Sequence, residues 1–293
     1  MNRHRFHLLA AWLSLTVGAL GVAPLAKKVA LEAGAAPIPV VLATALVSAV
    51  LVLAWLWPRG NLPELLRLPR RQAGAVLLVG VLGSGLVPLF AILAMTETTA
   101  SNRVLFQAAY PAATAVAARF LLGERLRAST WLLIGLVCVG LAAVNLEDDP
   151  TLVLFGWPFW LLLATLPLIG IADCIAKRSL TDVSPDIVAC GRAWGGVAIL
   201  LLALPLTTPA DWRALLDAWG WALLAGTCMA AFAIGLYRVF ALTRASIAAS
   251  LITLAPLLTV AGERVLLDVT LQPLQWLGFA LVLGAVLLLS RRA

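Results

Sequence analysis

Four polar side chains recur at helical spacing in one strongly apolar stretch of the chain. Arg103, Gln107, Tyr110 and Thr114 are separated by four, three and four residues, so they fall on one face of a helix. Polar groups that face lipid are costly, and such a stripe is expected to face protein or a water-filled cavity. The spacing therefore predicts a substrate-binding surface. Hydrogen bonding between packed helices is the alternative role.

Two acidic residues also lie within apolar stretches, Asp173 and Glu263. A carboxyl group inside a membrane protein is a candidate for proton exchange, because burial favours its protonated form. We predict that both acids act in coupling or gating, together with Arg192. The alternative for Glu263 is a structural ion pair with Arg192 or Arg264.

Two tryptophans, Trp160 and Trp194, lie deeper in their apolar stretches than the other nine. Most tryptophans stand near expected helix ends, as in the interfacial belts of membrane proteins. With Tyr110, Phe90 and Tyr237, the deeper pair predicts a pocket for an aromatic or quaternary ammonium substrate, the latter through cation–π contact. Packing in the protein core is the alternative.

Two prolines, Pro111 and Pro256, lie near the middle of their apolar stretches. Each removes a backbone hydrogen bond and can bend its helix. They predict either a hinge for alternating access or a static kink.

The composition is that of an integral membrane protein. Hydrophobic residues make up 62% of the chain and charged residues 12%, against about 45 to 50% and about 25% in soluble domains. The net charge of +7 comes from basic residues scattered at the ends of apolar runs, which argues against nucleic-acid binding. The four cysteines lack metal or redox spacing, and no Asp-rich metal motif or nucleophile with a base is present. We therefore predict no enzyme activity, no catalytic residue, and no cofactor or metal.

Ten apolar runs are long enough to cross a bilayer as helices. Their approximate spans are 8–31, 36–57, 73–95, 99–122, 129–146, 154–176, 186–206, 215–240, 246–267 and 273–290. With the N-terminus inside, fifteen basic residues lie on the cytoplasmic side and five on the outer side, namely Lys27, Lys28, Arg103, Arg213 and Arg264. The ten runs predict an all-α membrane protein of ten transmembrane helices. The charge bias predicts that both termini are cytoplasmic.

The second half of the chain repeats the first. The matched residues, each followed by its equivalent 145 positions later, are Ala100, Ser101, Pro111, Thr114, Arg119, Leu121, Leu122, Leu126 and Trp131. Residues 25–32 likewise resemble residues 175–182. Such a repeat predicts two five-helix units, residues 1–148 and 149–293. Because five is odd, the two copies must face opposite ways across the membrane, as inverted repeats do in many secondary transporters.

The repeated blocks resemble the EamA-like family of the drug/metabolite transporter superfamily. The blocks are AlaSerAsnArg at residues 100–103, Pro111, LeuLeuGlyGluArgLeu at residues 121–126 and Trp131. The resemblance implies a carrier, mostly an exporter of amino acids, other metabolites or toxic compounds, often driven by protons. It implies that helices one to four and six to nine enclose a central cavity. It also gives Gly123, Glu124 and Arg125 a structural role in the turn after helix four.

The two copies of helix four have diverged. Helix nine lacks the polar stripe, contains Glu263, and has Leu267, Asp268 and Val269 where the family often repeats LeuGlyGlu. We therefore expect substrate contact on helix four and coupling or gating on helix nine.

Together these features predict a secondary active transporter of a small organic metabolite, such as an amino acid or amine. We expect it to work by alternating access as an exporter, with coupling to protons. Its expected partners are the substrate and the lipid bilayer. Eighteen Arg against three Lys point to a bacterium with a GC-rich genome, and so to its cytoplasmic membrane. A flippase for a lipid-linked intermediate is the alternative function on this fold, and a purely structural membrane protein is a third.

Overall fold

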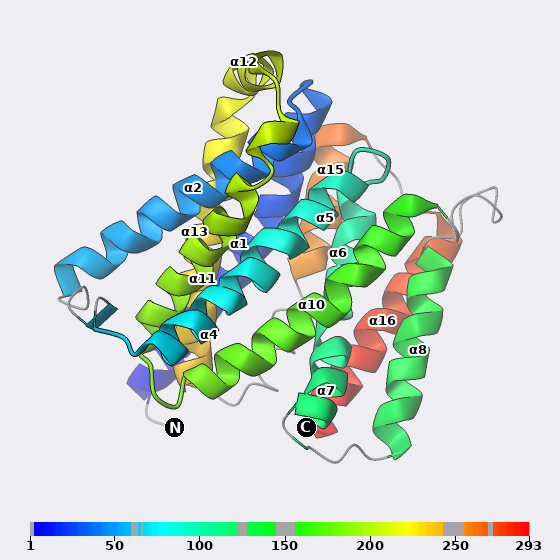
Figure 1. The fold of residues 1–293 in the computed structure, drawn as a ribbon. Coiled ribbons are helices and arrows are strands. Elements are labelled where there is room, and N and C mark those ends of the chain that lie inside the picture. The colour runs from blue at the N-terminus through cyan, green and yellow to red at the C-terminus, as the bar shows by residue number, and fades with distance from the viewer. Residues whose placement is uncertain are drawn as a thin grey trace.

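The computed structural model describes residues 3–59, 64–65, 67–121, 123, 128–144, 156–242, 255–268 and 272–292. The elements that these residues form are all helical (Figure 1). They include α1 (Arg3–Glu32), α2 (Pro37–Leu56), α4 (Arg70–Gly80), α8 (Ala128–Val144), α10 (Trp157–Ser179), α11 (Pro185–Leu201), α13 (Trp219–Leu242), α15 (Ala255–Leu267) and α16 (Pro273–Arg292). The two ends of the chain lie at the same end of the bundle in Figure 1, and the short helix α12 (Pro209–Asp217) lies at the opposite end.

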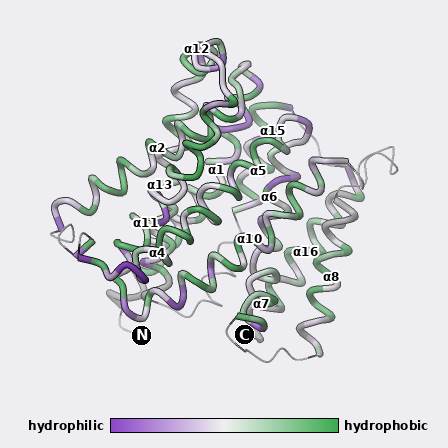
Figure 2. Tube along the Cα trace, viewed as in Figure 1, coloured by the Kyte–Doolittle hydropathy of each residue, from purple (hydrophilic) through white to green (hydrophobic). Residues whose placement is uncertain are grey.

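Five helical stretches among the described residues are long and apolar enough to cross a membrane. They are His7–Glu32, Pro37–Arg59, Arg70–Ala94, Trp157–Ser179 and Trp219–Val239, and a bent pair of helices makes a sixth if it is one span. Figure 2 shows apolar residues along these helices and a concentration of hydrophilic residues at the start of α4. The helices α8 and α16, which lie side by side, carry shorter apolar stretches.

The third expected span is a continuous helix with one widened turn. The π-helical turn η2 (Val81–Leu86) separates α4 from α5 (Val87–Ala94). Pro88 has no N–H to donate to the carbonyl of Ser84, four residues earlier, and its ring crowds that carbonyl. The turn that widens is the one that contains Ser84. Such turns change which groups a helix presents to its neighbour and are frequent at functional sites.

Helix four is two helices rather than the single one expected over residues 99–122. The first, α6 (Ala100–Ala108), and the second, α7 (Tyr110–Leu121), meet at Ala109. The segments Asn102–Ala108 and Ala112–Leu121 are inclined by 43°. Pro111 falls in the first turn of α7, where a proline needs no hydrogen-bond partner. The bend expected at Pro111 is therefore found directly before it.

Two close helix contacts are equivalent under the repeat. Gly21 of α1 packs against Leu258 of α15, and Gly170 of α10 packs against Ala113 of α7. Leu258 follows Ala113 by 145 positions, and Gly170 follows Gly21 by 149, close to the offsets found in the sequence. A side chain at either glycine would collide with the facing helix. In each case the first helix of one half lies against the fourth helix of the other half.

The ends of α7 and α15 share an unusual backbone conformation. Gly123 follows α7 with φ 70°, and Asp268 follows α15 with φ 53°. Asp268 stands 145 positions after Gly123, so the two residues are equivalent in the repeat. Positive φ costs a residue with a Cβ about 1 to 2 kcal/mol, although Asp and Asn tolerate it best. Asp268 therefore has the same positive φ as Gly123, although the LeuGlyGlu motif is not repeated there.

We expect the two positions to respond oppositely to substitution. Gly123→Ala should lower the free energy of unfolding by about 1 to 2 kcal/mol, because alanine is strained at positive φ. Asp268→Gly should leave it unchanged or raise it. Thermal unfolding in detergent micelles measures both. Gly74→Ala, a helical position with open space around it, is the control, and an equal loss there would contradict the conformational explanation.

Helix α12 was not expected, because the sequence placed the eighth span directly from residue 215. The structure begins that helix, α13, at Trp219, after a separate helix from Pro209. Thr208 caps α12 through its hydroxyl, which accepts from Asp211 N at 3.4 Å, and Asp211 Oδ2 accepts from Thr208 N at 2.7 Å. Thr208, Pro209 and Asp211 together form a recognisable helix-start signal, which apolar length alone does not reveal.

Candidate functional site

Arg192 is the most highly connected buried cation in the described part of the protein. It lies on α11 with 3% of its surface exposed. Its Nε donates to Ser84 Oγ at 3.0 Å, its Nη1 to Tyr237 Oη at 3.1 Å, and its Nη2 to the carbonyl of Gly83 at 3.4 Å. Gly83 and Ser84 belong to the widened turn η2, and Tyr237 belongs to α13. The guanidinium thus joins three helices around one point.

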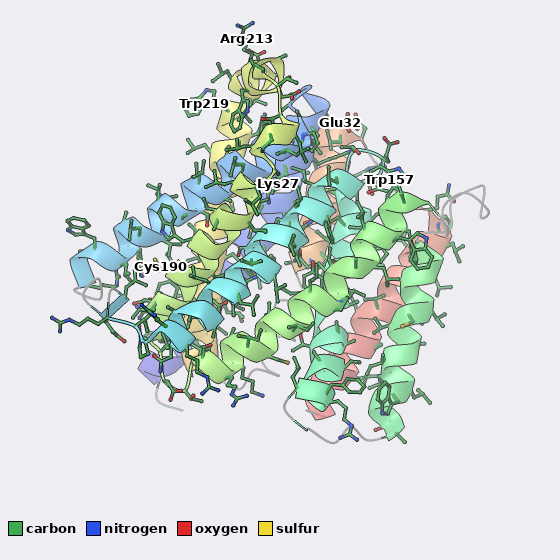
Figure 3. All side chains as sticks on the ribbon, in the orientation of Figure 1. Lys27, Glu32, Trp157, Cys190, Arg213 and Trp219 are labelled. Atoms are coloured by element: carbon green, nitrogen blue, oxygen red, sulfur yellow. The ribbon has the colours of Figure 1, made fainter. Side chains whose placement is uncertain are left out.

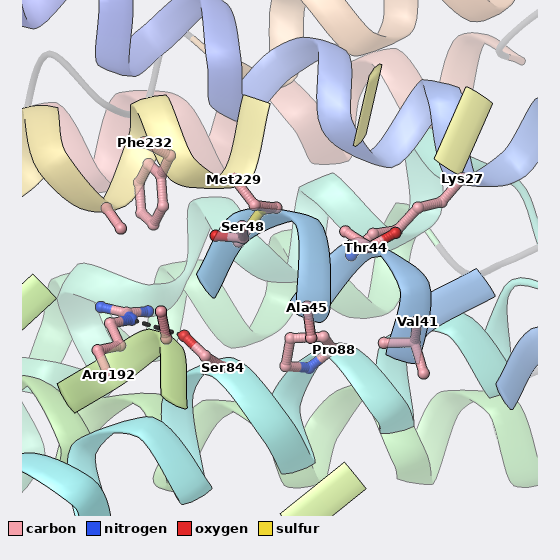
Figure 4. A pocket seen from close by; sticks show the side chains of 12 residues that line it. Lys27, Val41, Thr44, Ala45, Ser48, Ser84, Pro88, Arg192, Met229 and Phe232 are labelled. Carbon is pink, nitrogen blue, oxygen red and sulfur yellow. Dashed lines mark hydrogen bonds between the residues drawn. The ribbon is translucent and has the colours of Figure 1, made fainter. Parts of the chain in front are cut away.

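A pocket of about 410 Å³, its mouth included, lies beside this arginine (Figure 4). Its lining includes Lys27 of α1, Thr44 and Ser48 of α2, Arg192 of α11, and Met229 and Phe232 of α13. The first three of these residues come from the first half of the chain and the last three from the second half. The pocket therefore lies between the two halves, and two cations reach it.

Lys27 is a functional candidate that the sequence reading missed. That reading counted Lys27 and Lys28 among the charges on the outer side, yet the structure buries both within α1, with 3% and 9% exposed. Lys28 Nζ donates to the Met95 carbonyl at 2.9 Å and pairs with Glu32 at 2.8 Å. Figure 3 places Lys27 among the helices and Arg213 at the tip of the bundle, on α12. An ionisable residue well inside an apolar helix is a functional candidate by default, so the signal was available.

The polar stripe of helix four divides into two parts. Arg103 Nη1 donates to Gln107 Oε1 at 2.9 Å, and both side chains are buried. Arg103 Nε and Gln107 Nε2 have no hydrogen-bond partner among the described residues. Tyr110 and Thr114, beyond the bend, are half-buried. None of the four belongs to the lining of the pocket beside Arg192, so their role as substrate ligands stays a prediction.

Asp173 connects the second part of the stripe to Arg192. Its Oδ2 accepts a hydrogen bond from Thr114 Oγ1 at 3.1 Å, which links α10 to α7. The Asp173 carboxylate also lies within electrostatic range of the Arg192 guanidinium. Of the expected gating residues, the structure brings Asp173 and Arg192 together. Asp173 contacts the polar stripe and lies outside the pocket lining, whereas Arg192 is part of that lining.

Glu263 lies elsewhere. Its side chain is 0% exposed, and its Oε1 accepts a hydrogen bond from the backbone N–H of Ala100 at 2.8 Å. Ala100 is the first residue of α6, and a carboxylate is favoured at the positive end of a helix. Arg264 is exposed. This helix-terminus contact was not among the partners expected from the sequence, because a backbone N–H has no residue signature.

The predicted aromatic residues do not all lie together in one pocket. Trp160 and Trp194 are 51% and 37% exposed, and neither lines the pocket. Tyr237 is 1% exposed and holds Arg192. Phe232, which the sequence reading did not single out, lies on the pocket wall with the Arg192 guanidinium carbon 5.7 Å from its ring centroid. Tyr237, a member of the predicted aromatic set, is therefore joined to the pocket through its bond to Arg192.

Two of the remaining predicted residues, Gly123 and Pro256, lie at helix ends. Gly123 follows α7, while Glu124 and Arg125 lie outside the described residues. Pro256 is buried in the first turn of α15, and residues 243–254, directly before that helix, are outside the described residues.

Comparison with known proteins gives one family and one fold. The family model for EamA-like transporters matches residues 8–146 and again residues 156–291. Among solved structures 23 chains match. One of them, titled only "Crystal structure of protein", is 20% identical with a TM-score of 0.65, and the match covers 95% of this chain and 98% of that one. At this identity the likeness shows a shared fold alone. A comparison with curated proteins gave no match.

The family match accounts for the repeat seen in the sequence, since the same model fits each half of the chain once. It also agrees with the apolar helices of a multi-pass membrane protein. The chain belongs to the EamA-like transporter family.

Proposed function

We propose that this transporter is a secondary active carrier that exports a small organic metabolite across the bacterial cytoplasmic membrane by alternating access. Membership of the family makes it a drug/metabolite-type transporter, and the mechanism is what the proposal adds. The observation that carries it is the pocket between the halves, lined by Lys27 and Thr44 from one and by Arg192 and Phe232 from the other. A site between two halves can open to either side when the halves rock.

The proposed topology is ten spans in two inverted halves, residues 1–148 and 149–293, with both termini cytoplasmic. The contacts of Gly21 with Leu258 and of Gly170 with Ala113 support it, because inverted copies related by a two-fold axis make each contact twice. The position of both chain ends at one end of the bundle supports it as well, because an even number of spans returns the chain to its starting side.

Transport in proteoliposomes tests the proposed function. The purified protein is reconstituted, and flux of organic acids, amino acids, amines and quaternary ammonium compounds is followed with and without an imposed pH gradient. We expect gradient-dependent flux of one class. Absence of such flux for every class would count against a carrier, and activity only toward a lipid-linked headgroup would favour the flippase.

Asp173 is the proposed proton-coupling residue. It is hydrogen-bonded to Thr114 and acts electrostatically on Arg192. A change in its charge would therefore change the electrostatic potential at Arg192, where substrate is expected. Asp173→Asn keeps an acceptor oxygen for Thr114 but cannot exchange a proton. We expect it to abolish the stimulation of flux by a pH gradient while exchange of substrate at equal pH continues.

The matched control is Asp182→Asn, which neutralises an exposed acid in the turn after α10. It should leave the response to the gradient unchanged. If Asp173→Asn folds, as judged by its melting temperature, and still transports in proportion to the gradient, Asp173 does not couple protons.

A further inference from the structure

The pocket between the halves carries two basic side chains and no acidic one in its described lining. Lys27 and Arg192 are its charged residues, and hydroxyl groups of Thr44, Ser48 and Ser84 supply much of its remaining polarity. Figure 4 shows Lys27 and Arg192 on opposite sides of the pocket, with Phe232 on the Arg192 side and Ser48 and Met229 between the two cations. The electrostatic character of the pocket therefore favours an anion.

The two cations differ in what balances them. Arg192 already donates three hydrogen bonds, and Asp173 acts on it from outside the lining. Lys27 makes no hydrogen bond or ion pair with the residues that the structure describes, although it is only 3% exposed. The charge of Arg103 also acts on Lys27 and repels it. A buried ammonium group without a counter-charge is strongly unfavourable.

A bound anion would remove this cost. A lysine ammonium has three N–H donors and no acceptor, and hydrogen bonds between ionised partners are the strong ones. Thr44 uses its own hydroxyl proton on the Val40 carbonyl at 2.7 Å, which leaves its oxygen to accept rather than donate beside Lys27. The strongest donors at this end of the pocket are therefore those of Lys27.

We propose that this pocket binds a small organic anion, with one acidic group on Lys27 Nζ and the body of the molecule extending past Met229 and Phe232 toward Arg192. This assignment deepens the proposed carrier function and rests on it for the substrate's transport, but binding stands on the pocket alone. A second acidic group at the Arg192 end would strengthen binding, so a dicarboxylate fits better than a monocarboxylate. An amine or a quaternary ammonium compound would meet two like charges and be excluded.

Binding is tested with four probes of nearly equal length. Succinate carries two carboxylates, butyrate one, succinamide none, and putrescine two ammonium groups. Each is added at millimolar concentration to the purified protein in detergent, and the melting temperature is measured. We expect the rise in melting temperature to be largest with succinate, smaller with butyrate and smallest with succinamide. We expect no rise with putrescine. Equal stabilisation by succinamide or putrescine, or no response to any acid, would overturn the proposal.

Variants assign the effect to Lys27. Lys27→Met should weaken succinate binding by about tenfold or more, as expected for the loss of a charged hydrogen bond, and Lys27→Arg should retain much of it. Lys28→Met removes the same charge one residue along α1 but outside the lining, and should keep the succinate response even if it melts earlier. Unchanged binding in Lys27→Met would overturn the proposal, and the probe series on the unaltered protein keeps it testable if that variant does not fold.

Flux measurements separate the two proposals. Succinate that stabilises the protein but is not transported, with no flux of any other solute class, counts against the carrier and leaves the anion pocket standing. Gradient-dependent flux of amines, without stabilisation by any acid, supports the carrier and overturns the anion pocket.

Discussion

Replacing Arg192 by Leu is expected to lower transport at least about 10- to 100-fold. The substitution removes a cation from the pocket and the donors to Ser84, Tyr237 and Gly83. A hydrogen bond to a charged group is worth about 1.5 to 3 kcal/mol, and each 1.4 kcal/mol of binding energy corresponds to about a factor of ten. Initial flux in proteoliposomes, normalised to reconstituted protein, measures the loss. Arg192→Lys keeps the charge but not the planar fork of the guanidinium. Its initial flux should therefore lie between that of Arg192→Leu and that of the unaltered protein.

Two controls separate the charge of Arg192 from its structural bonds. The double variant Ser84→Ala with Tyr237→Phe removes two of its partners and keeps the guanidinium, so we expect a lower melting temperature with more transport than in Arg192→Leu. Arg213→Leu, at an exposed position on α12, should have no effect on flux. A double variant that loses transport as completely as Arg192→Leu at equal melting temperature would show that the bonds, not the charge, matter.

Removing the Glu263 side-chain carboxylate altogether is expected to lower the free energy of unfolding more than replacing it by an amide. Glu263→Ala leaves the buried N–H of Ala100 without this acceptor, which costs about 1 to 3 kcal/mol of unfolding free energy, and more when the lost partner is charged. Glu263→Gln retains an acceptor oxygen and should lose much less. Thermal unfolding in detergent micelles measures the difference. Glu97→Ala, an exposed acid between α5 and α6, is the control and should be neutral.

The same variants decide between two roles for Glu263. If its main function is to hold the start of α6 against α15, Glu263→Gln should transport in response to a pH gradient much as the unaltered protein does. Loss of that response at an unchanged melting temperature would instead assign Glu263 to proton coupling, as the sequence predicted.

Much of the helical architecture was accessible from local properties of the sequence. Apolar length predicted α1, α2 and α10, since long apolar runs satisfy their backbone groups as helices. The pattern could not show the break of helix four at Ala109 or the widened turn at Ser84, although Pro111 and Pro88 marked both neighbourhoods. The apolar pattern also did not separate α12 from α13, because it took no account of the helix cap at Thr208.

The candidate site was less accessible. The sequence singled out Arg192, Asp173 and Tyr237 because ionisable and aromatic groups in apolar helices are unusual. It placed Lys27 near an aqueous surface, because distance along the helix was the only guide to depth. The Lys27 and Arg192 side chains reach one pocket only because α1 and α11 pack around it.

By itself the sequence determined a membrane protein of this family, built twice from one pattern, because composition, apolar length and repeated motifs are written along the chain. The tertiary structure alone decided which charges meet. Lys27 faces a pocket shared with Arg192, whereas Glu263 binds the backbone of Ala100. The physical reason is that the balance of a buried charge depends on the rotation and crossing of neighbouring helices, and on backbone donors that no residue type reveals.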